Sequence, residues 1–341
     1  MIITNQVRGK NAPQYLERGT VLAKKYRLEK MIGGGGFGQI YRATDIDTGK
    51  VVAAKVEPQS EDAGRMVLEQ MVLTKLVGTR HSPRLVTHPN RHQILSQSYK
   101  TTPWIPSRKK DPIDIDRLQY ASGWLNSNNF IVMQMLGRNL TELRKAQSDR
   151  RFTVHTTVRV GIQILEALKA VHDLGFLHRD VKPSNMCVGI GEHRRIIYLV
   201  DFGMTRQYRL PSGEFRKERA YAAFRGTMRY VSLSVHERKE QGPVDDLWSV
   251  YYTLIELAEG SLPWRTITEH DEIFQLKRRL TFYDLCSFLP RHFEMFPILL
   301  RDLSYTSTPD YEKLTAALKR CCKLVDEEAD FEWDDDDSLS N

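Results

Sequence analysis

One segment constrains this chain more than any other part of its sequence. Residues 178–185 read His-Arg-Asp-Val-Lys-Pro-Ser-Asn, and Asp-Phe-Gly follows at residues 201–203. Asp180 can accept the proton of a hydroxyl group and orient that group, and Lys182 can offset negative charge on a transferring phosphate. Such a transfer needs positioning and charge neutralisation more than covalent chemistry. The segment therefore predicts phosphoryl transfer to a hydroxyl group.

Two residues of these segments carry oxygen atoms suited to a hard cation. The amide of Asn185 and the carboxylate of Asp201 are predicted ligands of Mg²⁺, which prefers oxygen. The four cysteines show no pair with metal-ligand spacing, so we expect neither a zinc site nor a disulfide framework.

A glycine-rich segment lies upstream, at residues 33–38, between two strand-like segments. Glycines let the backbone approach phosphates and present its N–H groups to them. Because this segment joins two strands, it does not fit a dinucleotide-binding turn, which joins a strand to a helix. Taken alone, this segment would equally fit a flexible loop, so its interpretation as a phosphate-binding segment depends on the motifs around it.

A lysine follows on the next predicted strand. The sequence Val-Ala-Ala-Lys at residues 52–55 alternates so that Lys55 and Ala53 face inward together. A buried lysine needs a partner, and Glu69 on the following helix is the candidate. Lys55 would then bind the α- and β-phosphates while Glu69 holds it in place. Standing alone, the two would be a surface lysine and a helix glutamate, but the order of all the motifs favours the catalytic interpretation.

The remaining pattern predicts a small β-rich part followed by a larger helical part. Residue alternation and turn residues predict strands at 26–32, 38–45, 51–57, 130–136, 186–188 and 195–200. A helix is expected over 61–77, with an apolar face formed by Leu68, Met71, Val72 and Leu76. A long helix with an apolar face is expected to end near Gly175; that face holds Val158, Ile162, Leu165, Leu168 and Val171. Residues 89–128 lack clear periodicity, and a loop that long is either functional or disordered.

The acidic residues are concentrated at the end of the chain. Nine of the 43 lie at residues 326–337, which leaves 50 basic against 34 acidic residues elsewhere. The favoured interpretation is a solvated, disordered end, and the alternative is an acidic strap that lies on the basic body. No nucleic-acid motif and no basic amphipathic helix stand out, so we expect neither a nucleic acid nor a membrane as partner.

The motifs together resemble those of eukaryotic protein kinases of the casein kinase 1 group, and within it the tau-tubulin kinase family. The segments that carry the resemblance lie at residues 129–140, 175–185, 224–230, 245–249, 261–264 and 331–333. The resemblance implies an α+β, bilobal protein kinase fold with a small β-rich N-lobe and a large, mainly helical C-lobe. Its expected parts are a lead-in at 1–25, an N-lobe at 26–136 with an insertion at 89–128, a C-lobe at 137–325 and an acidic tail at 326–341.

The resemblance also implies an ATP site that uses Mg²⁺. Met133 would be the gatekeeper, and the backbones of Gln134 and Leu136 would bind adenine. The residues expected to bind the nucleotide are Ile32, Gly33, Gly34, Gly35, Gly36, Phe37, Gly38, Ile40, Ala53, Lys55, Met133, Gln134, Leu136, Cys187, Val200 and Asp201. The expected catalytic residues are Asp180, Lys182, Asn185, Lys55, Glu69 and Thr227, with Asn185 and Asp201 as the metal ligands. Cys187 is interpreted either as a packing residue or as a thiol that can be reached in the ATP site.

The resemblance further implies the kind of partner. Lys182, two residues after Asp180, implies serine/threonine specificity, and Thr227 would bridge Asp180 and the substrate-binding loop. Arg229 matches a position that binds acidic or phosphorylated substrates in the group, so protein substrates of that kind are expected. Four further basic residues make the same region positive: Arg216, Lys217, Arg219 and Arg225. No secretory signal is recognised, and we expect a monomer in the cytoplasm, with nuclear entry left open.

Two alternatives come from other classes of protein. A catalytically silent scaffold with a kinase fold would be expected to lack at least one catalytic or metal-binding residue, whereas all are present here. A kinase of small molecules is the second alternative. The loop at Thr227 and the segment at 245–249 favour protein substrates over it, by resemblance.

Overall fold

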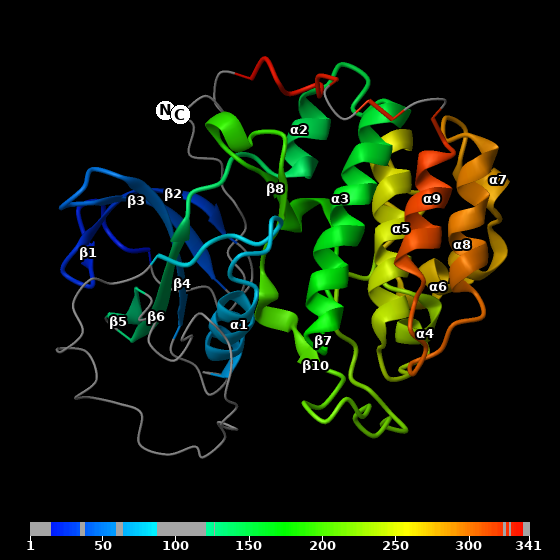
Figure 1. The fold of residues 1–341 in the computed structure, drawn as a ribbon, viewed down its shortest axis with the longest axis horizontal. Helices are drawn as coiled ribbons and strands as arrows, with labels where there is room; N and C mark the ends of the chain where they lie inside the picture. Colours follow the sequence, from blue (N-terminus) through cyan, green and yellow to red (C-terminus); the bar gives the residue numbers. More distant parts are fainter. Residues whose placement is uncertain are drawn as a thin grey trace. The chain divides into compact units, whose positions relative to one another are not determined.

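The computed structural model describes residues 15–34, 38–58, 64–86, 121–125, 127–322, 325–326 and 329–336. The chain divides into two compact units, shown in Figure 1. The first, called the sheet unit, comprises Met1–Val77 and Arg84–Met135; the second, called the helical unit, comprises Gly78–Pro83 and Leu136–Asn341.

The described part of the sheet unit is a six-stranded antiparallel sheet with one helix against it (Figure 1). Its strands, in the spatial order β1-β2-β3-β4-β6-β5, are β1 (Val21–Leu22), β2 (Tyr26–Gly34), β3 (Gln39–Asp45), β4 (Val51–Pro58), β5 (Ser122–Leu125) and β6 (Asn128–Gln134). The helix α1 (Gly64–Lys75) packs on β6. One face of β4 packs Val52, Ala54 and Val56 into the apolar core of this unit, so its other residues share the opposite face.

Two strands in the described part of the sheet unit were not predicted. β1 lies in the expected lead-in, and β5 lies in the segment expected to lack structure at 89–128, so both expectations are wrong for these residues. β1 has only two residues, too few for a period to be read. β5 contains Gly123, which lies against the Phe130 ring of β6 and hides the alternation that a side chain would show. Residues 87–120 lie outside the described part of the chain.

The predicted apolar face of α1 is partly wrong. Val72 is buried as expected, but Met71 is exposed, while Met66 and Glu69 are buried. A helix face centred on a buried glutamate does not appear in a search for apolar residues, because that search places charged residues toward solvent.

The helical unit contains eight helices among its described residues. They are α2 (Leu140–Ala146), α3 (Val154–Asp173), α4 (Leu233–His236), α5 (Pro243–Glu259), α6 (His270–Arg279), α7 (Phe282–Leu285), α8 (Met295–Leu300) and α9 (Tyr311–Lys319). α3 lies beside α5 and α9 (Figure 1). The contact is close because a Cβ atom at Gly161 of α3 would come within 2.9 Å of Leu318 and 3.0 Å of Leu254. None of the helices in the described ranges is long and apolar enough to cross a membrane.

Four short strands complete the helical unit as far as its residues are described. They are β7 (Phe176–Leu177), β8 (Met186–Val188), β9 (Ile197–Leu199) and β10 (Arg206–Gln207). α3 ends where Gly175 takes a left-handed conformation, with φ +80°, so the chain turns there directly into β7. β8 and β9 form an antiparallel pair, and β10 pairs with β7.

The described part of the acidic end, residues 329–336, lies against the helical unit. Phe331 and Trp333 are buried, with stacked rings 4.4 Å apart between centroids. Asp334 forms an ion pair with Arg195, at 2.8 Å. The interpretation of this segment as a solvated end is therefore wrong for these residues, and the strap alternative describes them. Tail residues 327–328 and 337–341 lie outside the described ranges.

Candidate active site

In the sheet unit, Lys55 and Glu69 form the ion pair that the sequence predicts. The Lys55 ammonium group donates to Glu69 Oε2 at 2.6 Å, and both side chains are buried. Lys55 lies on β4, between Ile40 of β3 and Ile131 of β6, so the sheet fixes its backbone on both sides. A lysine presented by a central strand and held by a helix glutamate is suited to bind phosphates.

Sequence reasoning missed a second carboxylate at this lysine. Glu57 Oε1 lies 3.2 Å from Lys55 Nζ, and Glu57 is as buried as Lys55. The signal was present, because residues two apart on a strand share a face. The same alternation that predicted an inward-facing Lys55 therefore also places Glu57 beside it.

The nucleotide-binding residues expected on the sheet unit occupy neighbouring strands. Gly33 on β2 is opposite Ile40 on β3, and Ala53 on β4 is opposite Met133 on β6. Gln134 ends β6. The others that the structure describes are Ile32 and Gly34 near the end of β2, and Gly38, just before β3. Gly35, Gly36 and Phe37 lie outside the described residues.

In the helical unit, three side chains converge on the Asp180 carboxylate. The Thr227 hydroxyl donates to Oδ1 at 2.7 Å, and the Lys182 ammonium donates to Oδ2 at 2.7 Å. The Asn185 amide donates to Oδ2 at 3.2 Å and to the Asp180 carbonyl at 2.9 Å. Lys182 also donates to Thr227 at 3.0 Å. The structure thus brings together four of the predicted catalytic residues.

Asn185 and Asp201 are brought close together by a strand pair. Asn185 directly precedes β8, Asp201 follows β9, and the Val200 amide donates to the Asn185 carbonyl at 2.9 Å. The Asn185 amide nitrogen is engaged with Asp180, so its amide oxygen is the atom suited to a cation. An amide oxygen and a carboxylate form a donor set that fits Mg²⁺. The two predicted ligands therefore fit such an ion.

A buried carboxylate fixes the backbone that carries Asp180. Asp246 of α5 accepts from the amides of His178 and Arg179, at 2.8 Å each, and its Oδ2 lies 2.9 Å from His172 Nε2. Burial alone would raise the pKa of Asp246, but its hydrogen bonds to His172 and His178 hold that pKa below the ordinary value. Asp246 thus stays ionised and orders the start of the catalytic segment.

Two further contacts fix the segment around Asp201. The buried Phe202 ring packs edge-on against the His178 ring, with centroids 5.1 Å apart. Arg179 donates to the Met204 carbonyl at 2.6 Å. Burial, together with the nearby Arg206, lowers the pKa of Arg179 to about 10, so it stays charged at neutral pH. These contacts join the two sequence motifs within one unit.

The remaining expected nucleotide-binding residues of the helical unit are Leu136, Cys187 and Val200. Cys187 lies on β8, opposite Tyr198 of β9, and is partly buried. Burial raises the pKa of its thiol to about 12. A thiol with that pKa is protonated and weakly nucleophilic at neutral pH, which favours packing over reactivity for Cys187.

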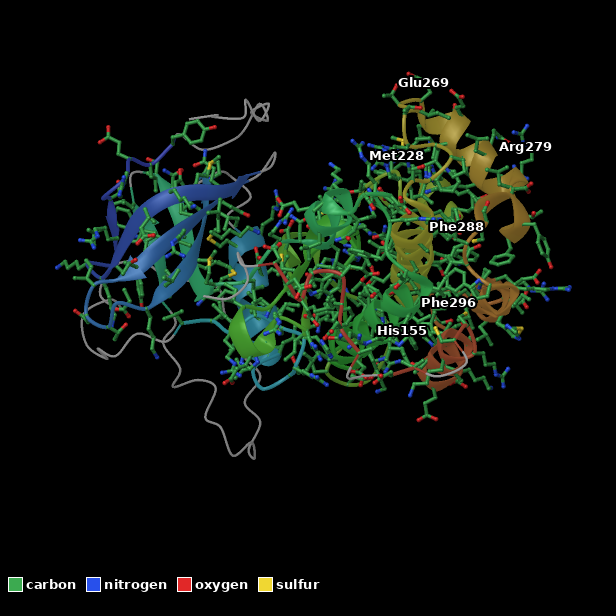
Figure 2. All side chains as sticks on the ribbon, turned by 90° about the horizontal axis from the view of Figure 1, so that it is seen from above. His155, Met228, Glu269, Arg279, Phe288 and Phe296 are labelled. Carbon is green, nitrogen blue, oxygen red and sulfur yellow. The ribbon has the colours of Figure 1, made fainter. Side chains whose placement is uncertain are left out.

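The loop that carries Thr227 is anchored by a lysine that sequence reasoning missed. Lys277 of α6 donates to the carbonyls of Met228 and Val231, at 2.9 and 2.6 Å. Burial lowers its pKa well below the ordinary value. In the view of Figure 2, Met228 lies on the same side of the helical unit as Glu269, which precedes α6, and Arg279, which ends it. A lysine in a charged sequence, Leu-Lys-Arg-Arg, gives no signal of burial.

One buried carboxylate neutralises part of the positive charge in the basic region that precedes and includes Arg229. The buried Glu240 accepts from Arg219 at 2.8 Å and pairs with Arg206 at 3.3 Å. Arg229 donates to the Arg265 carbonyl at 3.2 Å. The other basic residues expected there are exposed: Arg216, Lys217 and Arg225.

Comparisons with known proteins agree with this geometry. A model of the protein kinase domain family matches residues 26–324. The chain is 37% identical over 319 residues to a "Probable serine/threonine-protein kinase" of Dictyostelium discoideum, a match covering 93% of this chain and 58% of that relative. It is 34% identical to a "Putative casein kinase I" of Caenorhabditis elegans, covering 93% of this chain and 85% of the relative. It is 28% identical to "Casein kinase I homolog 2" of Saccharomyces cerevisiae, covering 92% and 53%.

The chain belongs to the protein kinase family, with serine/threonine kinases among its relatives and casein kinase I members among the distant ones. Its fold is the protein kinase fold, an antiparallel sheet followed by a helical region, as the sequence predicted. A kinase domain implies ATP and protein substrates. The chain spans 58% of the length of its Dictyostelium relative.

Proposed function

We propose that this chain is a serine/threonine protein kinase, which transfers the γ-phosphoryl group of ATP to serine and threonine hydroxyl groups of proteins. The observation that carries the proposal is the convergence of Thr227, Lys182 and Asn185 on the buried Asp180 carboxylate. Three donors hold this carboxylate in one orientation, as a group that orients a substrate hydroxyl and accepts its proton requires.

The other residues take complementary roles in the proposed reaction. Lys55 would bind the α- and β-phosphates, and Lys182 would offset charge on the γ-phosphate. Asn185 and Asp201 would hold Mg²⁺, which neutralises phosphate charge when it is bound. The buried Lys55–Glu69 pair and the strand pair that joins Asn185 to Val200 support these roles.

The finer assignment within the casein kinase 1 group is the tau-tubulin kinase family. Its support is the set of sequence segments that resemble that family, together with the partly exposed Arg229 beside the loop of Thr227. The exposed Arg216, Lys217 and Arg225 favour substrates with acidic or phosphorylated flanks. A peptide array in which neither kind of flank increases phosphorylation would contradict this preference. The monomeric state and the cytoplasmic location remain predictions from the sequence.

Radiolabelled ATP and casein provide the test of the proposed activity. We expect wild-type protein to transfer label only when Mg²⁺ is present, and hydrolysis of the product to release phosphoserine and phosphothreonine. Asp201→Asn should reduce transfer by about a hundredfold or more, because it removes a charged ligand of the metal. Absence of transfer from folded wild-type protein that binds ATP would overturn the proposal and favour the scaffold alternative.

A further inference from the structure

Glu57 is a buried carboxylate that the proposed mechanism does not use. It follows Lys55 by two residues on β4, and its Oε1 atom lies 3.2 Å from Lys55 Nζ. This oxygen is shielded from solvent and accepts no hydrogen bond from the described part of the chain. A buried charge is costly unless an opposite charge compensates it, so Glu57 depends on the Lys55 ammonium group.

The same side chain also lies against the glycine-rich segment. A Cβ atom at Gly38 would come within 2.9 Å of Glu57 Cγ and 3.0 Å of the Val56 carbonyl. Only glycine therefore fits at the last glycine of the segment while Glu57 keeps this position. Glu57 thus touches two parts of the predicted phosphate-binding apparatus, Lys55 through its carboxylate and Gly38 through its methylene groups.

The two carboxylates at Lys55 come from different elements. Glu69 belongs to α1, whereas Glu57 belongs to the same strand as Lys55, and that strand is paired on both sides. The Lys55–Glu57 distance is therefore set within β4 and does not depend on the position of α1. Lys55 would keep one carboxylate partner if α1 moved.

We propose that Glu57 is a second positioning residue for Lys55, which shares with Glu69 the task of holding the ammonium group where it binds nucleotide phosphates. Glu57 also joins the lysine to the glycine-rich segment through its contact with Gly38. This inference rests on the proposed kinase function. The inference adds a residue to those that the proposed function requires, because Glu69 would share with Glu57 the task of holding Lys55 in position.

Three variants of the full chain test the inference: Glu57→Gln, Glu69→Gln and the double variant. Gln keeps the shape and removes the charge. We expect each single variant to raise KM for ATP by about tenfold, since a negatively charged partner of the Lys55 ammonium group is lost, and to change kcat less. The KM for ATP of the double variant should approach that of Lys55→Met. Affinity for a fluorescent ATP analogue, measured without substrate protein, should fall in parallel.

Glu29→Gln serves as the matched control, because Glu29 lies on β2 of the same sheet and pairs with Arg42. It should leave KM for ATP unchanged. If Glu57→Gln lowers the melting temperature too far for assay, Glu57→Asp keeps the charge but shortens its reach, and a rise in KM for ATP is again expected.

Two outcomes would overturn the inference. One is a Glu57→Gln variant that binds the fluorescent ATP analogue as tightly as the wild type does. The other is a Glu69→Gln variant that is already as defective as Lys55→Met. Analogue binding separates this failure from failure of the proposed function. A wild-type chain that binds the analogue but transfers no phosphate would contradict the function alone.

Discussion

The two units hold their reactive groups in different ways. In the helical unit, Asp180 accepts hydrogen bonds from the hydroxyl group of Thr227 and from the ammonium and amide groups of two residues in its own segment, Lys182 and Asn185. In the sheet unit, the Lys55 ammonium group lies between two buried carboxylates. The first arrangement distributes its stabilisation over several bonds, whereas the second depends on opposite charges. The aspartate should therefore tolerate the loss of one neighbour better than the carboxylates around Lys55 do.

The largest expected effect comes from removing the lysine of each region. Lys55→Met takes the ammonium group from two buried carboxylates and should lower the free energy of unfolding by about 3–5 kcal/mol. Lys182→Met leaves Asp180 with donors from Thr227 and Asn185, and should cost less, about 1.5–3 kcal/mol. Urea denaturation of both variants measures the difference. Equal losses would show that the two regions do not differ in this way.

A change of pH should affect the helical unit through His236. Burial, then the nearby Lys277, lowers the pKa of His236 from 6.5 to about 3. Between these values the unfolded chain binds a proton that the folded chain does not, so stability falls as pH falls. Lowering the pH from 6.5 to about 5 should cost about 2 kcal/mol.

The matched variant is His236→Gln, which has no group that titrates in this range. Its free energy of unfolding, measured by urea denaturation across the same range, should change less with pH than that of the wild type. Parallel curves for the two proteins would exclude His236 as the source of the acid sensitivity.

The smallest expected effect concerns the loop that follows Thr227. Lys277→Met removes the donor to the Met228 and Val231 carbonyls, and should raise KM for a protein substrate by about tenfold with KM for ATP unchanged. Lys277→Arg should recover part of the loss. The exposed Lys239, which pairs with Glu237, provides the control, and Lys239→Met should leave both constants unchanged. A rise in KM for ATP alone would assign Lys277 to a different role.

The sequence predicted those features that depend on local spacing. Alternation on β4 predicted an inward-facing Lys55, and the order of motifs predicted its pairing with Glu69, which the structure contains. The motif residues Asp180, Lys182 and Asn185 lie within one short segment, so their closeness follows from the chain itself. Short spacing along the chain predicts such contacts, because the backbone allows residues that are close in the sequence few other arrangements.

Two of the missed features, the roles of Lys277 and Asp334, depend on contacts between distant parts of the chain, whereas the partner of Glu57 lies two residues away on the same strand. Glu57 and Lys277 are charged residues, and patterns of apolar residues place such residues at the surface. Asp334 of the acidic end lies in a run of carboxylates, which is typical of disorder, yet the basic partner Arg195 keeps it on the protein. Lys277 and Asp334 are held by partners that are distant in the sequence, and a single sequence does not reveal those partners.

The most direct test of the kinase assignment compares the wild type with Asp180→Asn in the rate of phosphate transfer from ATP to casein. Asp173→Asn, which alters an exposed carboxylate paired with Lys169, provides the matched control. We expect transfer by the wild type and the control, and a loss of about a hundredfold or more in kcat for Asp180→Asn. Transfer at the wild-type rate by folded Asp180→Asn would contradict the catalytic role of Asp180 and the mechanism built on it.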